Sequence, residues 1–389
     1  YRSHSFLTVP MCNHEGRLIG VLQLLNALGP DGQTPVAFSA SHQRLAESLA
    51  SQAAIALTKQ QLIDQLEKLF EAFIGVINVA VDEKSPYTGG HCQRVPELTM
   101  MLAKAINQTQ TGPMADVQFS DADMYELRIA ALLHDCGKVI TPVHVVDKAT
   151  KLETIHDRIH LIDARWAALK AQAHARAWQA IAAGADQAET LAEWQRFANA
   201  CDDDRAFLRR ANTGSERMSD EDVQRVQRIA QHHTWLTPDG QEAPFLTPDE
   251  VENLTIRAGT LNAAEREVIN HHIVATIKML EQLPWPQHLK NVTLYAGGHH
   301  ERMDGKGYPY GLKREELTWQ ARMMGIADIF EALTATDRPY KKPMSQAQAL
   351  AIMDNFVKIG HIDPDVYQVF LDHKVYEQFA QRFLQPLAP

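Results

Sequence analysis

The side chains best suited to chemistry are histidines and aspartates that stand against apolar, helix-like sequence. An unpartnered imidazole or carboxylate in such a setting costs free energy, so each needs a partner or a ligand. Three adjacent pairs and two single residues have this character: His91, His134–Asp135, His271–His272, His299–His300 and Asp328. Divalent cations satisfy imidazoles and carboxylates that converge in a helical core. The clusters therefore predict a metal site.

The ligand types narrow the metal and its chemistry. Nitrogen and oxygen ligands without thiolate favour iron, manganese, nickel or zinc. The adjacent pair His134–Asp135 can serve two metals, with the carboxylate as a bridge, and two metals can activate water for in-line attack at phosphorus. Taken alone, His91 could be an ordinary core or cap residue, and Asp328 could be an internal cap or the ion-pair partner of Arg322. Their occurrence together in one helical region favours the metal.

Composition excludes several classes of protein. The 389 residues include 38 Lys and Arg against 48 Asp and Glu, a net charge of −10, which disfavours general nucleic-acid binding. We see no apolar run of the ~18–20 residues that span a membrane and no secretory signal, so no membrane partner is expected. The four cysteines are scattered without a CxxC pair. A cytoplasmic protein is expected.

The N-terminal region reads as an α+β segment that runs into a long helix. Strands are expected over 6–11 and 18–26, followed by a helix from 41. Two strands and one helix cannot bury a sheet face alone, so we expect the sequence to begin inside a domain. Apolar residues spaced three to five apart continue the helix to about 77. This connector could pair with its copy in a homodimer or could pack on its own domain.

The rest of the chain, 81–389, reads as almost wholly helical. Helix starts are indicated by the capping boxes Thr247–Glu250 and Ser345–Gln348 and by the looser pair Asn262–Glu265. The Ala-rich stretch from about 157 to 211 is typical of a helical hairpin or insertion, and no chemistry is apparent in it.

Two motifs carry a family resemblance. His134-Asp135-Cys136-Gly137-Lys138 and the run from His299 to Pro309, which contains His-His-Glu and Gly-Tyr-Pro, resemble the HD-GYP family of HD-superfamily phosphohydrolases. The resemblance covers about 81–345. It implies a helical HD bundle that hydrolyses cyclic di-GMP to pGpG, GMP or both, by a hydroxide activated at two or three metals that are often iron or manganese. The N-terminal segment is similar, with little specificity, to the second half of a GAF domain.

The resemblance implies a set of metal ligands. Of the two adjacent histidines, His272 is chosen over His271 because His272, Thr276 and Leu280 share one helix face and match the family pattern. Tyr87 stands where members with a third metal carry glutamate. We therefore expect two divalent ions, iron or manganese, with nickel, zinc or magnesium as alternatives. The matching ligand positions are His91, His134, Asp135, His272, His299, His300 and Asp328.

It also implies catalytic and substrate-binding residues. Lys138 matches a lysine that contacts the scissile phosphate, where an ammonium can stabilise developing charge, and Asp135 is the second catalytic candidate. The substrate-binding candidates are Lys138, Asp304, Gly307, Tyr308, Arg338 and Lys341.

The predicted architecture is mostly α: a partial GAF-like module (1–58), a connector helix (59–80) and an HD-GYP domain (81–389) with a helical insertion at about 157–235. The predicted activity is that of a cyclic di-GMP phosphodiesterase. Two alternatives remain open: a phosphodiesterase for another cyclic dinucleotide such as cyclic GMP-AMP, and a non-catalytic cyclic-dinucleotide-binding adaptor.

Overall fold

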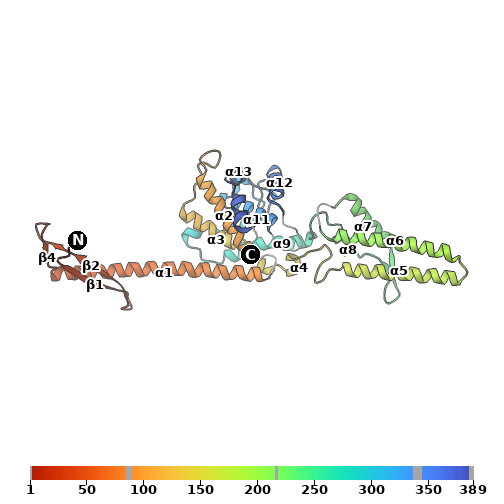
Figure 1. The fold of residues 1–389 in the computed structure, drawn as a ribbon, viewed down its shortest axis with the longest axis horizontal. Helices are drawn as coiled ribbons and strands as arrows, with labels where there is room; N and C mark the ends of the chain where they lie inside the picture. The colour runs from red at the N-terminus through yellow and green to blue at the C-terminus, as the bar shows by residue number, and fades with distance from the viewer. Residues whose placement is uncertain (1, 85–89, 215–217, 336–343, 385–389) are drawn as a thin grey trace. The chain divides into compact units, whose positions relative to one another are not determined.

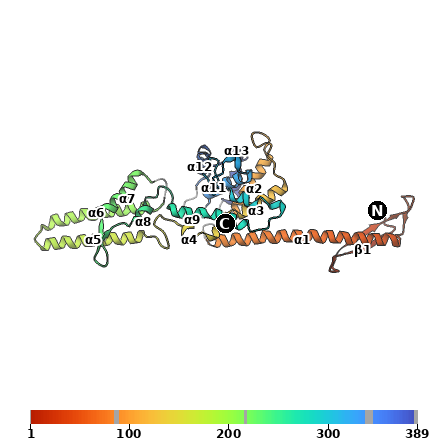
Figure 2. The same cartoon turned by 180° about the vertical axis from the view of Figure 1, so that it is seen from behind.

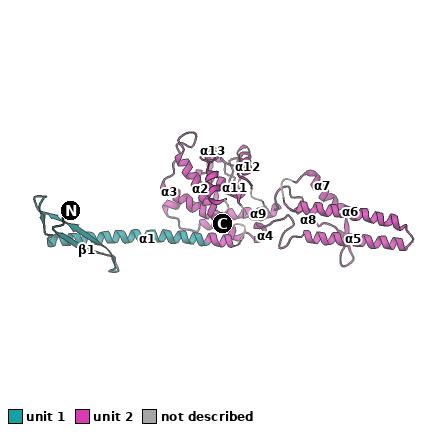
Figure 3. Ribbon diagram, in the orientation of Figure 1, with its two compact units in different colours: residues 1–76 teal, residues 77–389 magenta. Residues whose placement is uncertain are grey.

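The computed structural model describes residues 2–84, 90–214, 218–335 and 344–384. The chain forms two compact units, residues 1–76 and 77–389, which Figure 3 shows in separate colours. Helices make up most of the second unit and about half of the first, and strands are few and short (Figure 1). The predicted fold class, mostly α with a small N-terminal α+β part, is confirmed. Among the described residues, no helix has the length and apolarity needed to cross a bilayer.

The first unit is a β-hairpin packed on a helix. Strands β1 (Phe6–Cys12) and β2 (Leu18–Leu25) pair antiparallel, as the sequence predicts, and β3 (Ala27–Leu28) pairs with β4 (Pro35–Val36). Helix α1 (Ala40–Lys84) presents the small residues Ala46, Ala50 and Ala54 to the hairpin, one helical turn apart, and Val9 and Met11 of β1 are buried against them.

Helix α1 is continuous from Ala40 to Lys84. It therefore runs unbroken across the boundaries at 58 and 80 that were expected from the sequence, and the three-part division of the chain stays a prediction.

The second unit has a helical core that carries the candidate ligands. Helix α2 packs against α3, α11, α13 and α14, and α9 packs against α10 and the 3-10 turn that follows α3. Both Figure 1 and Figure 2 show α2, α3, α11 and α13 gathered in one group. The bounds are α2 (His91–Gln108), α3 (Asp121–Leu133), the 3-10 turn Cys136–Ile140, α4 (Val143–Val146), α8 (Pro248–Leu254), α9 (Ala263–Leu280), α10 (Val292–Gly297), α11 (Trp319–Thr334), α12 (Gln346–Lys358), α13 (Pro364–Asp372) and α14 (Val375–Phe383).

The helix starts follow local capping chemistry. All three expected capping boxes are present, at Thr247, Asn262 and Ser345. In each, the side chain of the first residue accepts a hydrogen bond from the backbone N–H three residues later. The side chain of that later residue accepts from the backbone N–H of the first. Each box satisfies two backbone donors that the helix leaves unpaired.

The Ala-rich stretch folds into a pair of long helices. Helices α5 (Ile159–Ala182) and α6 (Gln187–Asn212) lie side by side in both views and contact each other extensively (Figures 1 and 2). Helix α7 (Asp220–His232) and the short strands β5 (Thr234–Leu236) and β6 (Glu242–Pro244) complete the segment. Its buried core centres on Trp166 and Phe245.

Candidate metal centre

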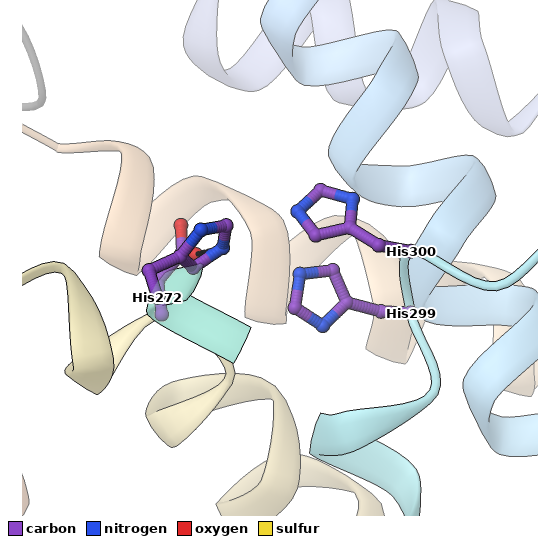
Figure 4. Close-up of side chains that lie close together, drawn as sticks. His272, His299 and His300 are labelled. Carbon is purple, nitrogen blue, oxygen red and sulfur yellow. Dashed lines mark ion pairs between the residues drawn. The ribbon is translucent and has the colours of Figure 1, made fainter. Parts of the chain in front are cut away.

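The predicted ligands converge from five parts of the second unit. His91 begins α2, His134 and Asp135 follow α3, and His272 lies within α9. His299 and His300 follow α10, and Asp328 lies within α11. Figure 4 shows His272 facing His299 and His300.

The seven side chains form two groups that share one carboxylate. One group holds His91, His134, Asp135 and Asp328, and the other holds Asp135, His272, His299 and His300; within each, the ligand atoms lie within 4.8 Å of one another. Asp135 Oδ2 lies 3.2 Å from Nε2 of both His91 and His134, and Asp135 Oδ1 lies 3.2 Å from Nε2 of His272. Asp135 thus offers one oxygen to each group, as a carboxylate bridging two metals would.

Hydrogen bonds to the backbone fix which ring nitrogen carries the proton. Nδ1 of His134, His272 and His299 donates to the carbonyl oxygen three residues earlier, at 2.7, 2.5 and 2.6 Å. Because a carbonyl oxygen only accepts, the proton of the neutral ring is on Nδ1. Each Nε2 therefore turns a lone pair toward the centre, the arrangement found in metal-bound histidines.

Those lone pairs are left without partners. Nε2 of His134, His272 and His299 and Oδ1 of Asp135 are buried and accept no hydrogen bond from the described residues. Several unpaired acceptors facing one another repel and are costly to bury. Divalent cations would satisfy all of them together, so the residues present fit a two-metal site.

His91 is held differently, by a carboxylate. Its Nδ1 donates to Glu331 Oε2 at 2.5 Å, and Glu331 Oε1 accepts from Arg94 Nε at 2.6 Å. His91 Nε2 then faces Asp135 and Asp328, at 3.2 and 3.3 Å. Arg322, considered from the sequence as a partner of Asp328, instead donates to Asp363 at 3.0 Å. Asp328 is therefore available to the centre.

The electrostatics favour charged carboxylates beside neutral imidazoles at His299 and His300. At His91 burial opposes charge, but Asp135, Asp328 and Glu331 raise the pKa of the imidazole well above its usual value. Burial opposes charge on Asp135 and Asp328, yet Lys138 beside Asp135 and His91 beside Asp328 hold both carboxyl pKa values well below the usual range. Burial lowers the pKa of His299 well below its usual value and that of His300 to about 4. Neutral imidazoles and ionised carboxylates are the forms that bind metals.

Gly137 lets the turn that carries Asp135 approach α9. A Cβ on Gly137 would lie 2.0 Å from the backbone oxygen of His272 and 2.5 Å from the backbone nitrogen of Thr276, distances that no side chain tolerates. The hydroxyl of Thr276 accepts from Gly137 N at 2.9 Å. This close contact joins the two parts of the chain that carry Asp135 and His272, which explains the glycine of the His-Asp motif.

A cleft of about 630 Å³ opens beside the centre. His299, His300, Asp328 and Tyr308 line it, and the Tyr308 ring stacks on His300 with centroids 4.9 Å apart. Its volume is in the range of small-molecule sites.

None of the remaining predicted residues that the structure describes lines this cleft. Lys138 reaches the centre, where its ammonium lies 2.5 Å from Asp135 Oδ2. Asp304 accepts from Arg302 at 2.8 Å and from the backbone of Lys306 at 3.1 Å, and neither Asp304 nor Gly307 is among the described residues that line the cleft. The last three positions, Tyr87, Arg338 and Lys341, lie outside the described residues.

Two buried glutamates that support the centre were not predicted. Glu331 holds His91, and Glu301 accepts from the backbone of Tyr310 and Leu312, at 2.7 and 2.9 Å, which fixes the Gly-Tyr-Pro loop. Glu331 follows Asp328 by three residues on α11, a spacing that places both on one helix side and could have drawn attention to it.

Comparison with protein families agrees with this fold. Residues 88–237 and 245–366 each match an HD domain, and residues 1–57 match a GAF domain. The resemblance drawn from the motifs, an HD-type domain preceded by a GAF-like segment, is confirmed.

Curated relatives carry related names. A 3'3'-cGAMP-specific phosphodiesterase 1 of Vibrio cholerae is 33% identical over 162 residues, 38% of this chain and 36% of the relative. A 3'3'-cGAMP-specific phosphodiesterase 3 of the same organism is 26% identical over 76% of this chain and 37% of the relative. A cyclic di-GMP phosphodiesterase of Pseudomonas aeruginosa is 45% identical over 73 residues, 19% of this chain and 17% of the relative. The chain thus spans well under half of the length of these relatives.

Proposed function

We propose that this HD-domain chain is a cytoplasmic, metal-dependent phosphodiesterase that hydrolyses cyclic di-GMP to pGpG, GMP or both. The observation that carries the proposal is the pair of ligand groups joined by Asp135, with buried acceptors unpaired, beside a cleft of about 630 Å³. Relatives named as phosphodiesterases for cyclic di-GMP or 3'3'-cGAMP support the substrate class. The four cysteines are free, in accord with a reducing compartment.

The proposed cofactors are two divalent ions, iron or manganese. One would be held by His91, His134, Asp135 and Asp328, and the other by Asp135, His272, His299 and His300. When bound, such a pair supplies Lewis acidity at phosphate oxygens and water activated for in-line attack at phosphorus.

Lys138 and Asp135 are the catalytic residues of the proposal. Burial opposes charge on Lys138, but Asp135 and Asp328 raise its pKa above the usual value, so the ammonium stays protonated. From its position beside Asp135 it can donate to a phosphate oxygen as negative charge develops there. Tyr308, stacked on His300, offers an aromatic face to a substrate in the cleft.

The alternative substrate is 3'3'-cGAMP, the substrate named for the relative that aligns with most of this chain. Metal ligands do not distinguish bases, so parallel hydrolysis of both cyclic dinucleotides decides between them.

The central experiment is anaerobic metal analysis with a hydrolysis time course on both dinucleotides, for the wild type and the variant His134→Ala with Asp135→Ala. The double variant should lose turnover and at least one metal equivalent. Retained turnover would refute the site. If the wild type binds metal and a cyclic dinucleotide but hydrolyses neither of the two dinucleotides, the result would instead support the non-catalytic binding adaptor.

We also propose that the connector helix pairs with its copy in a homodimer. Leu62, Leu66, Leu69 and Phe73 of α1 are each about half exposed or more, at the three- and four-residue spacing of a coiled-coil seam. Sedimentation of the full chain should show a dimer that Leu66→Glu with Leu69→Glu dissociates. The exposed position Gln65, changed to Glu, is the matched charge control. A wild-type monomer would contradict the proposal.

A further inference from the structure

Among the described residues, most cations that line the cleft beside the candidate centre have an acidic partner within the protein. Arg302 donates to both oxygens of Asp304, at 3.0 and 2.8 Å. Arg322 donates to Asp363 at 3.0 Å and to the backbone oxygen of Leu317. Lys306 Nζ lies 4.0 Å from Asp304. Arg302 and Arg322 are therefore engaged in holding the loop and helix that form the cleft, whereas Lys306 is largely exposed.

Arg266 is the exception. It lines the cleft from α9 together with Asn270, one helical turn further on. In the described part of the chain, neither side chain makes a hydrogen bond or ion pair. Tyr308 lines the same cleft. The cleft thus presents an uncompensated guanidinium beside an amide and an aromatic ring.

The start of α9 is held firmly. Glu265, adjacent to Arg266, accepts a hydrogen bond from the backbone N–H of Asn262. Its two carboxylate oxygens also accept from the buried Lys148 ammonium, at 2.8 and 2.7 Å. Lys148 also donates to Asn253 of α8 at 3.0 Å. The backbone that carries Arg266 is therefore fixed in place, so Arg266 can bind without ordering its own helix turn.

The position of Arg266 points to a part of the ligand away from the reacting phosphorus. Arg266 precedes His272 by six residues, or about 9 Å along the helix axis. A cyclic dinucleotide extends from the cleaved phosphodiester to a second phosphate and two bases. The phosphate and a guanine base each offer paired acceptors, whereas adenine offers an acceptor beside a donor. Guanidinium groups bind paired acceptors bidentately, whether phosphate oxygens or the O6 and N7 atoms of guanine.

We propose that Arg266, assisted by Asn270, binds a pair of hydrogen-bond acceptors of the cyclic dinucleotide on the side away from the metal ligands. The pair is two phosphate oxygens or O6 and N7 of a guanine, and this contact determines affinity and specificity. The inference rests on the proposed function and adds a contact from α9 that the motifs do not contain. Arg266 acts in binding and not on the reacting atoms, so it contributes equally to ground state and transition state.

The test compares full-length wild type with Arg266→Ala, Arg266→Lys and the control Arg176→Ala, which removes a charge from an exposed position on α5. Three readouts are used: kinetics with cyclic di-GMP, cyclic di-AMP and 3'3'-cGAMP; kinetics with bis(p-nitrophenyl) phosphate, a small diester; and calorimetric binding of a phosphorothioate analogue of cyclic di-GMP.

Arg266→Ala should raise KM, and Kd for the analogue, by about five- to a hundredfold, with little change in kcat. Arg266→Lys should recover part of the loss, because it keeps the charge but not the fork. The small diester and Arg176→Ala should be unaffected. A rise in KM for all three dinucleotides assigns the contact to a phosphate, and a rise confined to guanine-containing ones assigns it to the base.

Unchanged KM and Kd in Arg266→Ala would overturn this inference while leaving the proposed function intact. An equal loss with the small diester would also overturn it, because the effect would then lie at the reacting phosphate. A wild type that cleaves the small diester but neither binds nor cleaves a cyclic dinucleotide would overturn both.

Discussion

The candidate metal centre and the α5–α7 segment are both helical, and both bury polar groups, yet they satisfy them in opposite ways. In the α5–α7 segment the charges find partners within the protein. Arg165 pairs with Glu250 at 2.6 Å, and Arg205 pairs with Asp163, also at 2.6 Å. At the centre, acceptors face acceptors, and Nε2 of three histidines and Oδ1 of Asp135 have no partner among the described residues.

This difference distinguishes buried polar groups that stabilise the fold from buried polar groups that bind a ligand. A buried polar group that is matched inside the protein fixes one packing arrangement, whereas a convergent set left unmatched requires something from outside. The indole nitrogens of Trp166 and Trp194 are also unpartnered among the described residues. They are donors, however, and cannot hold a cation. Several unpaired acceptors that converge on one place, and not a single unpaired atom, identify the centre.

The largest expected effect comes from the adjacent histidines of α9. His272 is buried with Nε2 unpaired, and His271 is exposed. His272→Ala should lower kcat/KM by about a thousandfold and reduce bound metal, because it removes a ligand. His271→Ala is the matched control and should stay within a few-fold of wild type. Kinetics and metal analysis of both variants check this, and equal effects would contradict the choice of His272.

Removing a charge that is paired in the α5–α7 segment should lower stability and leave the metal centre unchanged. Arg165→Ala leaves Glu250, whose side chain is 3% exposed, as an uncompensated charge. The expected cost is about 3–5 kcal/mol in the free energy of unfolding this segment, measured by hydrogen exchange, with bound metal unchanged. Lys170→Ala breaks the exposed pair with Asp202 and should cost less than about 1 kcal/mol. Loss of metal in Arg165→Ala would show that the two regions are not independent.

Lys151, which lies between α4 and α5, tests the cost of a buried charge. Its ammonium is buried and bonds to a backbone oxygen and a methionine sulfur, and burial lowers its pKa from 10.5 to about 8. Because the folded pKa is depressed, the unfolded chain binds more protons between pH 8 and 10.5, and stability should rise with pH across this window. The rise contributed by Lys151 is at most about 3 kcal/mol.

Lys151→Met should abolish that rise and stabilise the protein at pH 7. Urea denaturation of wild type and variant from pH 7 to 10.5 measures both effects. Parallel pH profiles in the two proteins would contradict the assignment to Lys151.

The smallest effect is expected at Glu331, which is matched by Arg94 and His91 although it adjoins the centre. Hydrogen bonds from His91, together with Arg94, lower the pKa of Glu331 to about 2 against the effect of burial. Glu331→Gln should weaken metal binding by about tenfold to a hundredfold without unfolding the protein. Metal titration checks this, with Glu267→Gln, exposed on α9, as the control. Unchanged affinity would show that His91 needs no such support.

Features that depend on neighbouring residues followed from the sequence. The capping boxes at Thr247, Asn262 and Ser345 form as expected because donor and acceptor lie three residues apart. The hairpin of residues 6–25 and the long helix after it follow from apolar periodicity. The seven candidate ligands were identified because their side-chain chemistry is unusual in apolar sequence and their motifs match a family.

Contacts between distant segments did not follow from the sequence. Glu331 and His91 are 240 residues apart, and no local pattern joins them. The pairing of Arg322 with Asp363, and not with Asp328, was likewise hidden. The ligand contact proposed for Arg266 was inferred from which cations in the cleft already have partners, and those partners are set by how distant segments pack.

For this protein, the sequence by itself determined the helical class, the three helix starts that have capping boxes and the side chains that can bind metal, since these depend on residue type and on spacing within a few positions. Only the tertiary structure decided that ligands from five segments share one carboxylate, which nitrogen of each imidazole faces the centre, and which cation in the cleft is left without a partner. These properties depend on distances between segments far apart in the chain, and those distances are set by how the helices pack.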